Sequence, residues 1–594
     1  MADTVVKIGG ASGFWGDAAV ATPQLLTAGG LDFIVYDYLA EITMAILARF
    51  RAGSPDLGYA TDFVTGAMAP NLAEIARQGV RIVSNAGGVN PAGCAQALRA
   101  EIAKQGLDLS VAVVFGDDLM DQIDRIVASG PTDMFTGAAF PDADKVGSIN
   151  AYLGAFPIAR ALDSGADIVV TGRCVDSAVT LAACIHHFGW SASDLDALAG
   201  GSLAGHILEC GPHATGGNFT DWLEIAGSLA MIGYPVAEVH ADGSCDISKP
   251  TGTGGKVSRG TVAEQMLYEI GDPQAYVLPD VVCDFSNVVV EETAPDRVRL
   301  SGAQGRGVPD SYKTCLTWKN GYRGGHLFGF YGLDAERKAQ VFADTAITRA
   351  CAALQAQNLP EFTETSIELL GTEAQFGGLR QAGPAREVTV KIAVRHPKAA
   401  GVGLFLKEAT GLGLSAPPGL CGFAGARPKP SPVMALFSFL TPKADVSIAV
   451  DGVPFSEPGV PTPLQPVQHP PPPVVVPGDD RLIEVPLIGL AWGRSGDKGD
   501  MANIGLIARH AGYLPHIWHG VTEAKLRAVF GHVLTGRIDR FLLPGSASIN
   551  IVLHGSLGGG GTSSLRNDPQ GKGFAQLLLA TQILVPAGIM KEKV

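Results

Sequence analysis

Five short apolar segments recur along the first 190 residues, each followed by a polar or glycine-rich loop and then by an alanine- and leucine-rich stretch. They cover residues 4–9, 33–36, 81–84, 110–115 and 166–171. A strand with apolar side chains on both faces is typical of a parallel sheet covered by helices on both sides. The pattern therefore predicts an α/β fold with a doubly wound, mostly parallel sheet.

One helix in this region has clear sequence signals at both ends. Asn90 suits the N-cap, and Pro91 suits the first helical position, where its missing N–H costs nothing. The helix is predicted to run to residue 105, and Gly106 suits the left-handed position that follows.

Beyond residue 200 the regular rhythm is lost. Short strands are expected at residues 281–285 and 297–300, further strands at 363–370 and 387–394, and a helix at 339–355. These elements predict an α+β half that completes the first body. We therefore assign residues 1–453 to one large body, which divides into a parallel α/β half over 1–200 and an α+β half over 201–453.

A proline-rich linker over residues 454–481 contains the run LQPVQHPPPPVVVPGDD, which excludes helix and central strand. Residues 482–590 then predict a small α+β domain. Its expected strands are 483–491, 538–543 and 548–554, and its expected helices are 522–534 and 574–583. Because a polyproline spacer is expected to bury little, we expect the two sides to fold separately.

Composition limits the classes of function. Hydrophobic residues make up 46% and charged residues 17%, and the formal net charge is −14. A cationic groove for nucleic acid and docking on anionic membranes are therefore disfavoured, and no apolar run is long enough to span a bilayer. The nine cysteines form no C-x-x-C pair, which favours free thiols in a reducing, cytoplasmic compartment.

The loops after the five segments carry the candidate chemistry. Ligands of open parallel sheets bind beyond the carboxyl ends of the strands, where these loops share one edge. Their polar residues are Ser12, Asp17, Asp37, Asn85, Asn90, Asp117, Asp118, Arg173 and Asp176. Any one aspartate or asparagine here can equally be a helix cap. Arg173 and Asp176 either form an ion pair that fixes their loop or present a guanidinium to a carboxylate or phosphate, with Asp176 as a base.

Two further segments offer acid/base or anion-binding groups. HILECGPHATGGNF gathers Glu209, Cys210 and His213, and the glutamate and histidine suit an acid/base pair or a metal. No third ligand follows in sequence, so we assign no metal. KPTGTGGKVSRGTV surrounds Lys249 and Arg259 with glycines and hydroxyl residues such as Thr253, and it predicts either a phosphate-binding loop or a surface turn.

The first loop has the outline of a dinucleotide fingerprint, since glycines follow the first strand and Asp37 lies about 20 residues further on. The glycines at Gly10, Gly13 and Gly16 have the wrong spacing, however, and Trp15 is bulky where a pyrophosphate should approach. We therefore assign no cofactor. Two more polar glycine loops, around residues 491–505 and 554–573, place Asp497, Lys498, Asp500, Arg566 and Asp568 in the small domain.

Taken together, these motifs resemble the acyclic terpene utilisation (AtuA) family. The matching segments are GGASGFWGD, SNAGGVNPAG, TGRCVDSA, LECGPHATGGNF, KPTGTGGKVS and YEIGDPQAY. GLAWGRSGDKGDMANIG and LGGGGTSSLRNDPQGKG look like that family's appended ferredoxin-fold domain. The resemblance implies bacterial catabolism of citronellol- and geraniol-type terpenoids through acyl-CoA intermediates.

The leading hypothesis is a lyase that acts on a branched acyl-CoA or a related carboxylic acid, by hydration, dehydration or C–C cleavage. The candidate catalytic residues are Asp176, His213, Glu209 and Arg173, and the candidate substrate-binding residues are Ser12, Asp17, Asn85, Asn90, Lys249, Thr253 and Arg259. The alternatives are an NAD(P)-linked oxidoreductase and a non-catalytic subunit or acyl-CoA carrier that supports a carboxylase. The expected partner is a small molecule, and a homo-oligomer is compatible with the sequence.

Overall fold

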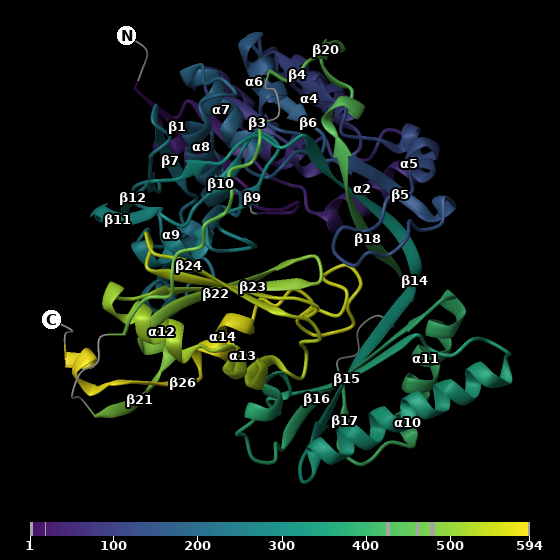
Figure 1. Ribbon diagram of the computed structural model, residues 1–594. Coiled ribbons are helices and arrows are strands. Elements are labelled where there is room, and N and C mark those ends of the chain that lie inside the picture. The colour runs from purple at the N-terminus through teal and green to yellow at the C-terminus, as the bar shows by residue number, and fades with distance from the viewer. Residues whose placement is uncertain (1–3, 18, 423–427, 459–461, 476–480, 592–594) are drawn as a thin grey trace.

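The computed structural model describes residues 4–17, 19–422, 428–458, 462–475 and 481–591. Figure 1 shows an α/β body, a second sheet that projects from it on the long strand β14, and a small C-terminal domain against both. Parts of the predicted linker, residues 459–461 and 476–480, lie outside the described residues.

The five predicted segments form the centre of the main sheet. They lie in the order β1-β2-β3-β6-β4, and each neighbouring pair is parallel. The predicted fold class, a doubly wound parallel sheet, is confirmed. Antiparallel strands extend both edges to eleven strands. The bounds are β1 Val5–Gly10, β2 Phe33–Tyr36, β3 Arg81–Ser84, β4 Val111–Phe115, β6 Ile168–Thr171, β7 Val236–His240, β8 Cys245–Ser248, β11 Val289–Ala294, β12 Arg297–Ser301, β19 Ile448–Val450 and β20 Val453–Phe455.

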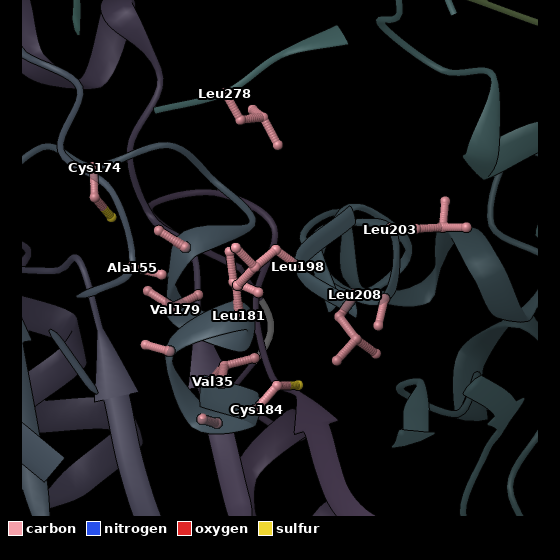
Figure 2. Close-up of a cluster of buried hydrophobic side chains, with 14 of the residues drawn as sticks. Val35, Ala155, Cys174, Val179, Leu181, Cys184, Leu198, Leu203, Leu208 and Leu278 are labelled. Atoms are coloured by element: carbon pink, nitrogen blue, oxygen red, sulfur yellow. The ribbon is translucent and has the colours of Figure 1, made fainter. Parts of the chain in front are cut away.

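Successive side chains of each central strand enter two separate cores. In β2, Phe33 and Val35 point into one core, and Ile34 and Tyr36 point into the other. This alternation on two buried faces explains why the strands are apolar throughout. The first core is covered by α6 (Phe156–Asp163), α7 (Ala178–Phe188) and α8 (Leu195–Leu208), and the second by α1 (Ala21–Ala28), α2 (Glu41–Gly53), α3 (Leu72–Gln78) and α4 (Pro91–Gln105). Figure 2 shows Val35 beside Leu181 and Cys184 of α7.

Helix α4 confirms the prediction made from its end signals. It spans Pro91–Gln105, the Asn90 side chain accepts a hydrogen bond from the N–H of Gly93, and Gly106 has a φ of 67°. Asn90 also donates to the carbonyls of Pro55 and Leu57. Its described contacts are therefore those of a helix cap that also fixes a neighbouring loop.

The second half contains a strand that the apolar pattern does not predict. β14 (Ser311–Tyr331) is 21 residues long and pairs with β5 (Val146–Ala151), β16 (Glu387–His396), β17 (Leu420–Cys421) and β18 (Ser431–Pro442). Its middle section, KNGYRGG, is polar and glycine-containing and therefore lacks the apolar signal of a strand. Next to it, α10 (Ala335–Ala356), α11 (Ala399–Gly411) and β15 (Glu364–Leu370) complete the projecting unit, and α10, β15 and β16 match the predicted positions.

The C-terminal domain has a four-stranded antiparallel sheet in the order β22-β23-β25-β24. Two expectations for it are corrected. The polar glycine segment around residues 491–505 is a hairpin and not a loop. The predicted closing helix ends earlier than expected, because residues 582–586 form a strand in which exposed and buried positions alternate. The bounds are β21 Leu482–Pro486, β22 Ala491–Lys498, β23 Met501–Ala508, β24 Ile538–Leu543, β25 Ser548–Leu553, β26 Gln582–Pro586, α12 Leu514–Gly520, α13 Glu523–Phe530 and α14 Phe574–Leu579.

The two sides of the linker are not independent bodies. Described linker residues are mostly exposed, as expected, but the C-terminal domain packs directly on the main body. Asp221 accepts hydrogen bonds from both Nη atoms of Arg509 at 2.6 Å and from the Trp492 indole at 2.7 Å. Ile507 and Leu543 belong to the first core of the main body. Cutting the linker would therefore expose this interface, and separate folding of the two sides stays a prediction.

Candidate active site

The five loops at the carboxyl ends of the parallel strands are joined by hydrogen bonds. The Ser12 hydroxyl donates to the Asp37 carbonyl at 3.1 Å, and the Asn85 amide donates to the Asp37 carboxylate. The backbone N–H of Arg173 donates to the Asp117 carboxylate at 2.8 Å. Ser12, Asp37, Asn85, Asp117 and Arg173 are all buried. The structure thus brings together residues that are about 160 positions apart in sequence, at the sheet edge where ligands of such folds bind.

Arg173 follows β6, which lies between β3 and β4 in the sheet. Its side chain is only 3% exposed, and Nη1 donates to Asp176 Oδ1 at 2.6 Å and to the Cys174 carbonyl at 2.9 Å. The guanidinium carbon stands 4.1 Å from the centre of the Tyr152 ring. Nε is buried and has no hydrogen-bond partner among the residues that the structure describes. A buried donor of this kind is costly unless a ligand or water completes it.

Asp176 forms the ion pair that the sequence offered as one alternative. Its side chain is 40% exposed, and it lies just before α7, whose N-cap is Ser177. Asp176 is therefore a partly accessible carboxylate beside a buried guanidinium, and it is not the cap of the helix.

Three site residues were not predicted from the sequence. Glu41, in the first turn of α2, accepts hydrogen bonds from the Tyr152 hydroxyl at 2.6 Å and from Lys313 at 3.2 Å. Burial opposes ionisation of Glu41, but the charges of Lys313 and Arg173 and the bond from Tyr152 prevail and lower its pKa. Lys313 comes from β14 in the other half of the body, so only the tertiary fold places it here.

Other carboxyl groups at this edge keep their protons more readily than usual. Burial raises the pKa of Asp37 well above its ordinary value, the charge of Asp176 adds to the effect, and Arg173 opposes it. Burial likewise raises the pKa of Asp117 to about 7. The site therefore places Glu41, whose pKa is lowered, near Asp37 and Asp117, whose pKa values are raised, and groups with such opposite shifts suit acid/base chemistry.

Glu209 and His213 do not form the predicted pair. Glu209 instead lies 2.8 Å from Nδ1 of the buried His206, one helical turn earlier. Burial raises the pKa of Glu209, and the imidazole of His206 opposes the shift. His213 faces Arg494 of the C-terminal domain, with Nη2 2.8 Å from Nε2. Burial and the Arg494 charge hold the pKa of His213 well below its usual value. Within the described parts of the chain, no three His, Cys, Asp or Glu side chains are arranged to hold a metal ion.

The glycines of the first loop serve packing. A Cβ at Gly10 would lie 2.9 Å from the Leu208 carbonyl oxygen, and one at Gly13 would lie 2.9 Å from Cys210 backbone atoms. Asp17 fixes this loop by accepting from the N–H of Gly13 at 2.9 Å and from the Tyr234 hydroxyl at 2.7 Å. Gly10 and Gly13 thus face α8 and the chain after it, and this arrangement does not favour a dinucleotide cradle.

The predicted anion loop is held by contacts within the protein. Lys249 pairs with Asp296 at 3.1 Å, and the Thr253 hydroxyl donates to the Pro250 carbonyl at 2.6 Å. Arg259, at the start of α9 (Arg259–Met266), donates to the carbonyls of Ala508 and Ser546 across the domain interface. A role for this loop in ligand binding stays a prediction.

Two open surface hollows, around His516 and around Trp518, lie on the C-terminal domain and the linker. The candidate site is assigned instead from the buried charges around Arg173, where the groups suited to chemistry gather. A search for helices able to cross a membrane finds none in the described residues.

Comparison with known proteins agrees with the architecture. The family model "Acyclic terpene utilisation family protein AtuA" matches residues 6–451, and the model "AtuA ferredoxin-like domain" matches residues 485–584. No curated protein and no solved structure matches the chain. The first match covers the α/β body with its projecting sheet, and the second covers the domain that packs on it. The chain belongs to the acyclic terpene utilisation AtuA family.

Proposed function

We propose that the chain is a lyase of acyclic terpenoid or branched acyl-CoA breakdown, which transfers protons next to a carboxylate or thioester carbonyl. The observation that carries the proposal is the buried Arg173 guanidinium, whose Nε has no partner among the described residues, together with nearby carboxyl groups whose pKa values are shifted in opposite directions, lowered for Glu41 and raised for Asp37. Such an arrangement suits binding of a substrate oxygen that gains negative charge during the reaction.

In a dehydration, Asp176 accepts the proton from the carbon beside the carbonyl, and Arg173 stabilises the enolate oxygen that forms. A protonated carboxyl such as Asp37 then gives its proton to the departing hydroxyl group, and water leaves. Hydration is the same sequence in reverse. In a C–C cleavage, Asp176 instead accepts the proton of the 3-hydroxyl group, and the bond between the hydroxyl-bearing carbon and the carbon beside the carbonyl breaks. A carbonyl compound leaves, Arg173 stabilises the enolate that remains, and a carboxyl group such as Asp37 gives its proton to the enolate carbon. His213 is less suited to the role of base, because the Arg494 charge faces it.

The two alternatives make different predictions. An NAD(P)-linked oxidoreductase would have to bind the nucleotide over glycines that pack against residues 208–210, so calorimetry is expected to find no binding. A carrier would bind acyl-CoA without changing it.

The test is incubation of the purified chain in D2O with branched unsaturated and 3-hydroxy acyl-CoAs and the corresponding acids, followed by mass spectrometry. The expected result is turnover, with deuterium gained beside the carbonyl. Asp176→Asn should lower the rate by about 10²–10⁴-fold, as loss of a general base does. Asp163→Asn is the matched control, since Asp163 also pairs with a basic side chain, that of His186, but lies at the end of α6. Binding without turnover would favour the carrier and exclude the lyase.

A further inference from the structure

The β22–β23 hairpin of the C-terminal domain reaches into the main body. Its strands are joined by residues 499–500, and Lys498 pairs with Met501 at the tip. A Cβ at Gly496 would lie 2.4 Å from Tyr268 Cε2, and one at Gly505 would lie 2.5 Å from Leu267 Cβ. Glycine at both positions therefore permits the hairpin to lie directly on the chain that follows α9.

Two asparagines of the C-terminal sheet hold that segment in place. Asn503 accepts from the N–H of Glu269 at 2.9 Å and donates to the Leu267 carbonyl, and Asn550 donates to the Ile270 carbonyl at 2.8 Å. Glu269 has a φ of 58°, in the left-handed region that non-glycine residues rarely occupy. Such conformations persist where the surroundings fix them, and they are common at functional sites.

The hairpin tip is also fixed by hydrogen bonds within the C-terminal domain. Asp500 accepts hydrogen bonds from the N–H groups of Leu557 at 3.2 Å and Gly559 at 2.7 Å. Gln570 donates to Asp497 at 3.1 Å. Contacts with both domains thus fix the hairpin tip, and Lys498 beside it has a defined position.

Lys498, the last residue of β22 at this tip, contacts the main body through its ammonium group. It is half-buried, its Nζ donates to the Glu269 carbonyl at 3.2 Å, and Nζ stands 5.1 Å from the centre of the Tyr276 ring. Burial and the charge of Lys313 lower the pKa of Lys498, whereas the carboxylates of Glu269, Asp176 and Glu209 oppose this. The Tyr276 ring in turn stands 5.8 Å from the ring of His206, whose Nδ1 lies 2.8 Å from Glu209. Packed side chains therefore connect the Lys498 ammonium of the C-terminal domain with Glu209 of the main body.

We propose that the active site is shared between the two domains and that Lys498 is a substrate-binding residue, which donates to the carboxylate or thioester oxygen of the ligand opposite Arg173. This inference rests on the proposed function for its ligand class. An ammonium has three donors, and the described contact with Glu269 uses one of them. A second cation from the other domain would bind substrate only when the domains are docked.

The first part of the test concerns position and needs no substrate. Lysines are methylated with ¹³C-formaldehyde and a borane reductant, which keeps their charge, and the Lys498 resonance is assigned by its loss in Lys498→Arg. Asp176→Asn removes a nearby negative charge and should lower the pH midpoint of that resonance. Asp539→Asn is the control, because Asp539 pairs with His554 within the C-terminal domain. An equal midpoint in wild type and Asp176→Asn would overturn the shared site.

The second part concerns binding, with 3-methylbut-2-enoate, geranate and geranoyl-CoA as probes. At least one probe should move the Lys498 resonance, and Lys498→Met should weaken its binding about 10- to 100-fold, as loss of a hydrogen bond between charged groups does. Lys525→Met is the control, since Lys525 donates to a carbonyl on β26 within its own domain. Movement of the resonance without turnover would refute the lyase but retain Lys498 as a ligand. Failure of every probe to move it would refute Lys498 as a ligand.

Discussion

Replacing Gly496 by alanine should weaken the contact between the two domains. The new methyl group would lie 2.4 Å from Tyr268 Cε2 and 2.8 Å from Glu269 Cγ, so one side of the interface must shift. Tyr268 has little freedom to do so. It is 4% exposed, Arg494 lies over its ring at 4.8 Å, and the His213 ring packs against it at 5.4 Å.

The magnitude follows from the cost of overpacking, about 1–3 kcal/mol. The reduced freedom of the unfolded chain does not offset this cost, because both domains stay folded when they separate. Separation of the domains would therefore become about 5- to 140-fold more frequent, at 1.4 kcal/mol for each factor of ten.

Hydrogen exchange of the backbone amides at residues 267–271 measures this opening, because Asn503 covers the Glu269 N–H only while the domains are docked. Gly489→Ala is the control. Gly489 lies in the same domain, and a Cβ there would meet only Val485 Cγ1 at 3.6 Å, an ordinary contact. Equal exchange rates in the two variants would refute the claim that Gly496 is required for docking.

Three further predictions concern single side chains. Arg173→Lys should lower kcat/KM about 10²-fold or more with little loss of stability, because lysine keeps the charge but not the planar set of donors. Asp221→Ala should cost about 1–3 kcal/mol in denaturant unfolding by breaking the partly exposed pair with Arg509. Burial raises the pKa of Glu264 to about 7, so wild-type stability should fall as the pH rises from about 4.5 to 7, and Glu264→Gln should reduce that slope; equal slopes would contradict the assignment.

The sequence predicts the central sheet well because its strands are buried on both faces. Segments such as residues 33–36 have no polar side to obscure the pattern, and the helix from Pro91 to Gln105 has a cap at each end. The hairpin over residues 491–508 was missed because glycines and charges interrupt its strands. Those glycines are there for contact with Tyr268 and Leu267, which no local pattern reveals.

The candidate site likewise contains some residues whose positions the sequence predicts and others whose positions it does not. Arg173, Asp176 and Asn85 follow predicted parallel strands, so the shared sheet edge predicts that they meet. Lys313 and Lys498 reach the same region from a long antiparallel strand and from another domain. Their positions depend on tertiary contacts, as does the choice of His206 over His213 as the partner of Glu209.

The central claim is that substrate binds at the carboxyl edge of the parallel sheet, on Arg173. It is tested most directly by a crystal structure of Asp176→Asn with the acyl compound that the wild-type chain converts. In that structure the carboxylate or thioester oxygen should lie within 3.2 Å of Arg173 Nε, the usual limit for such a hydrogen bond. A ligand bound instead at the Lys249 loop, with Arg173 Nε still without a partner, would contradict it.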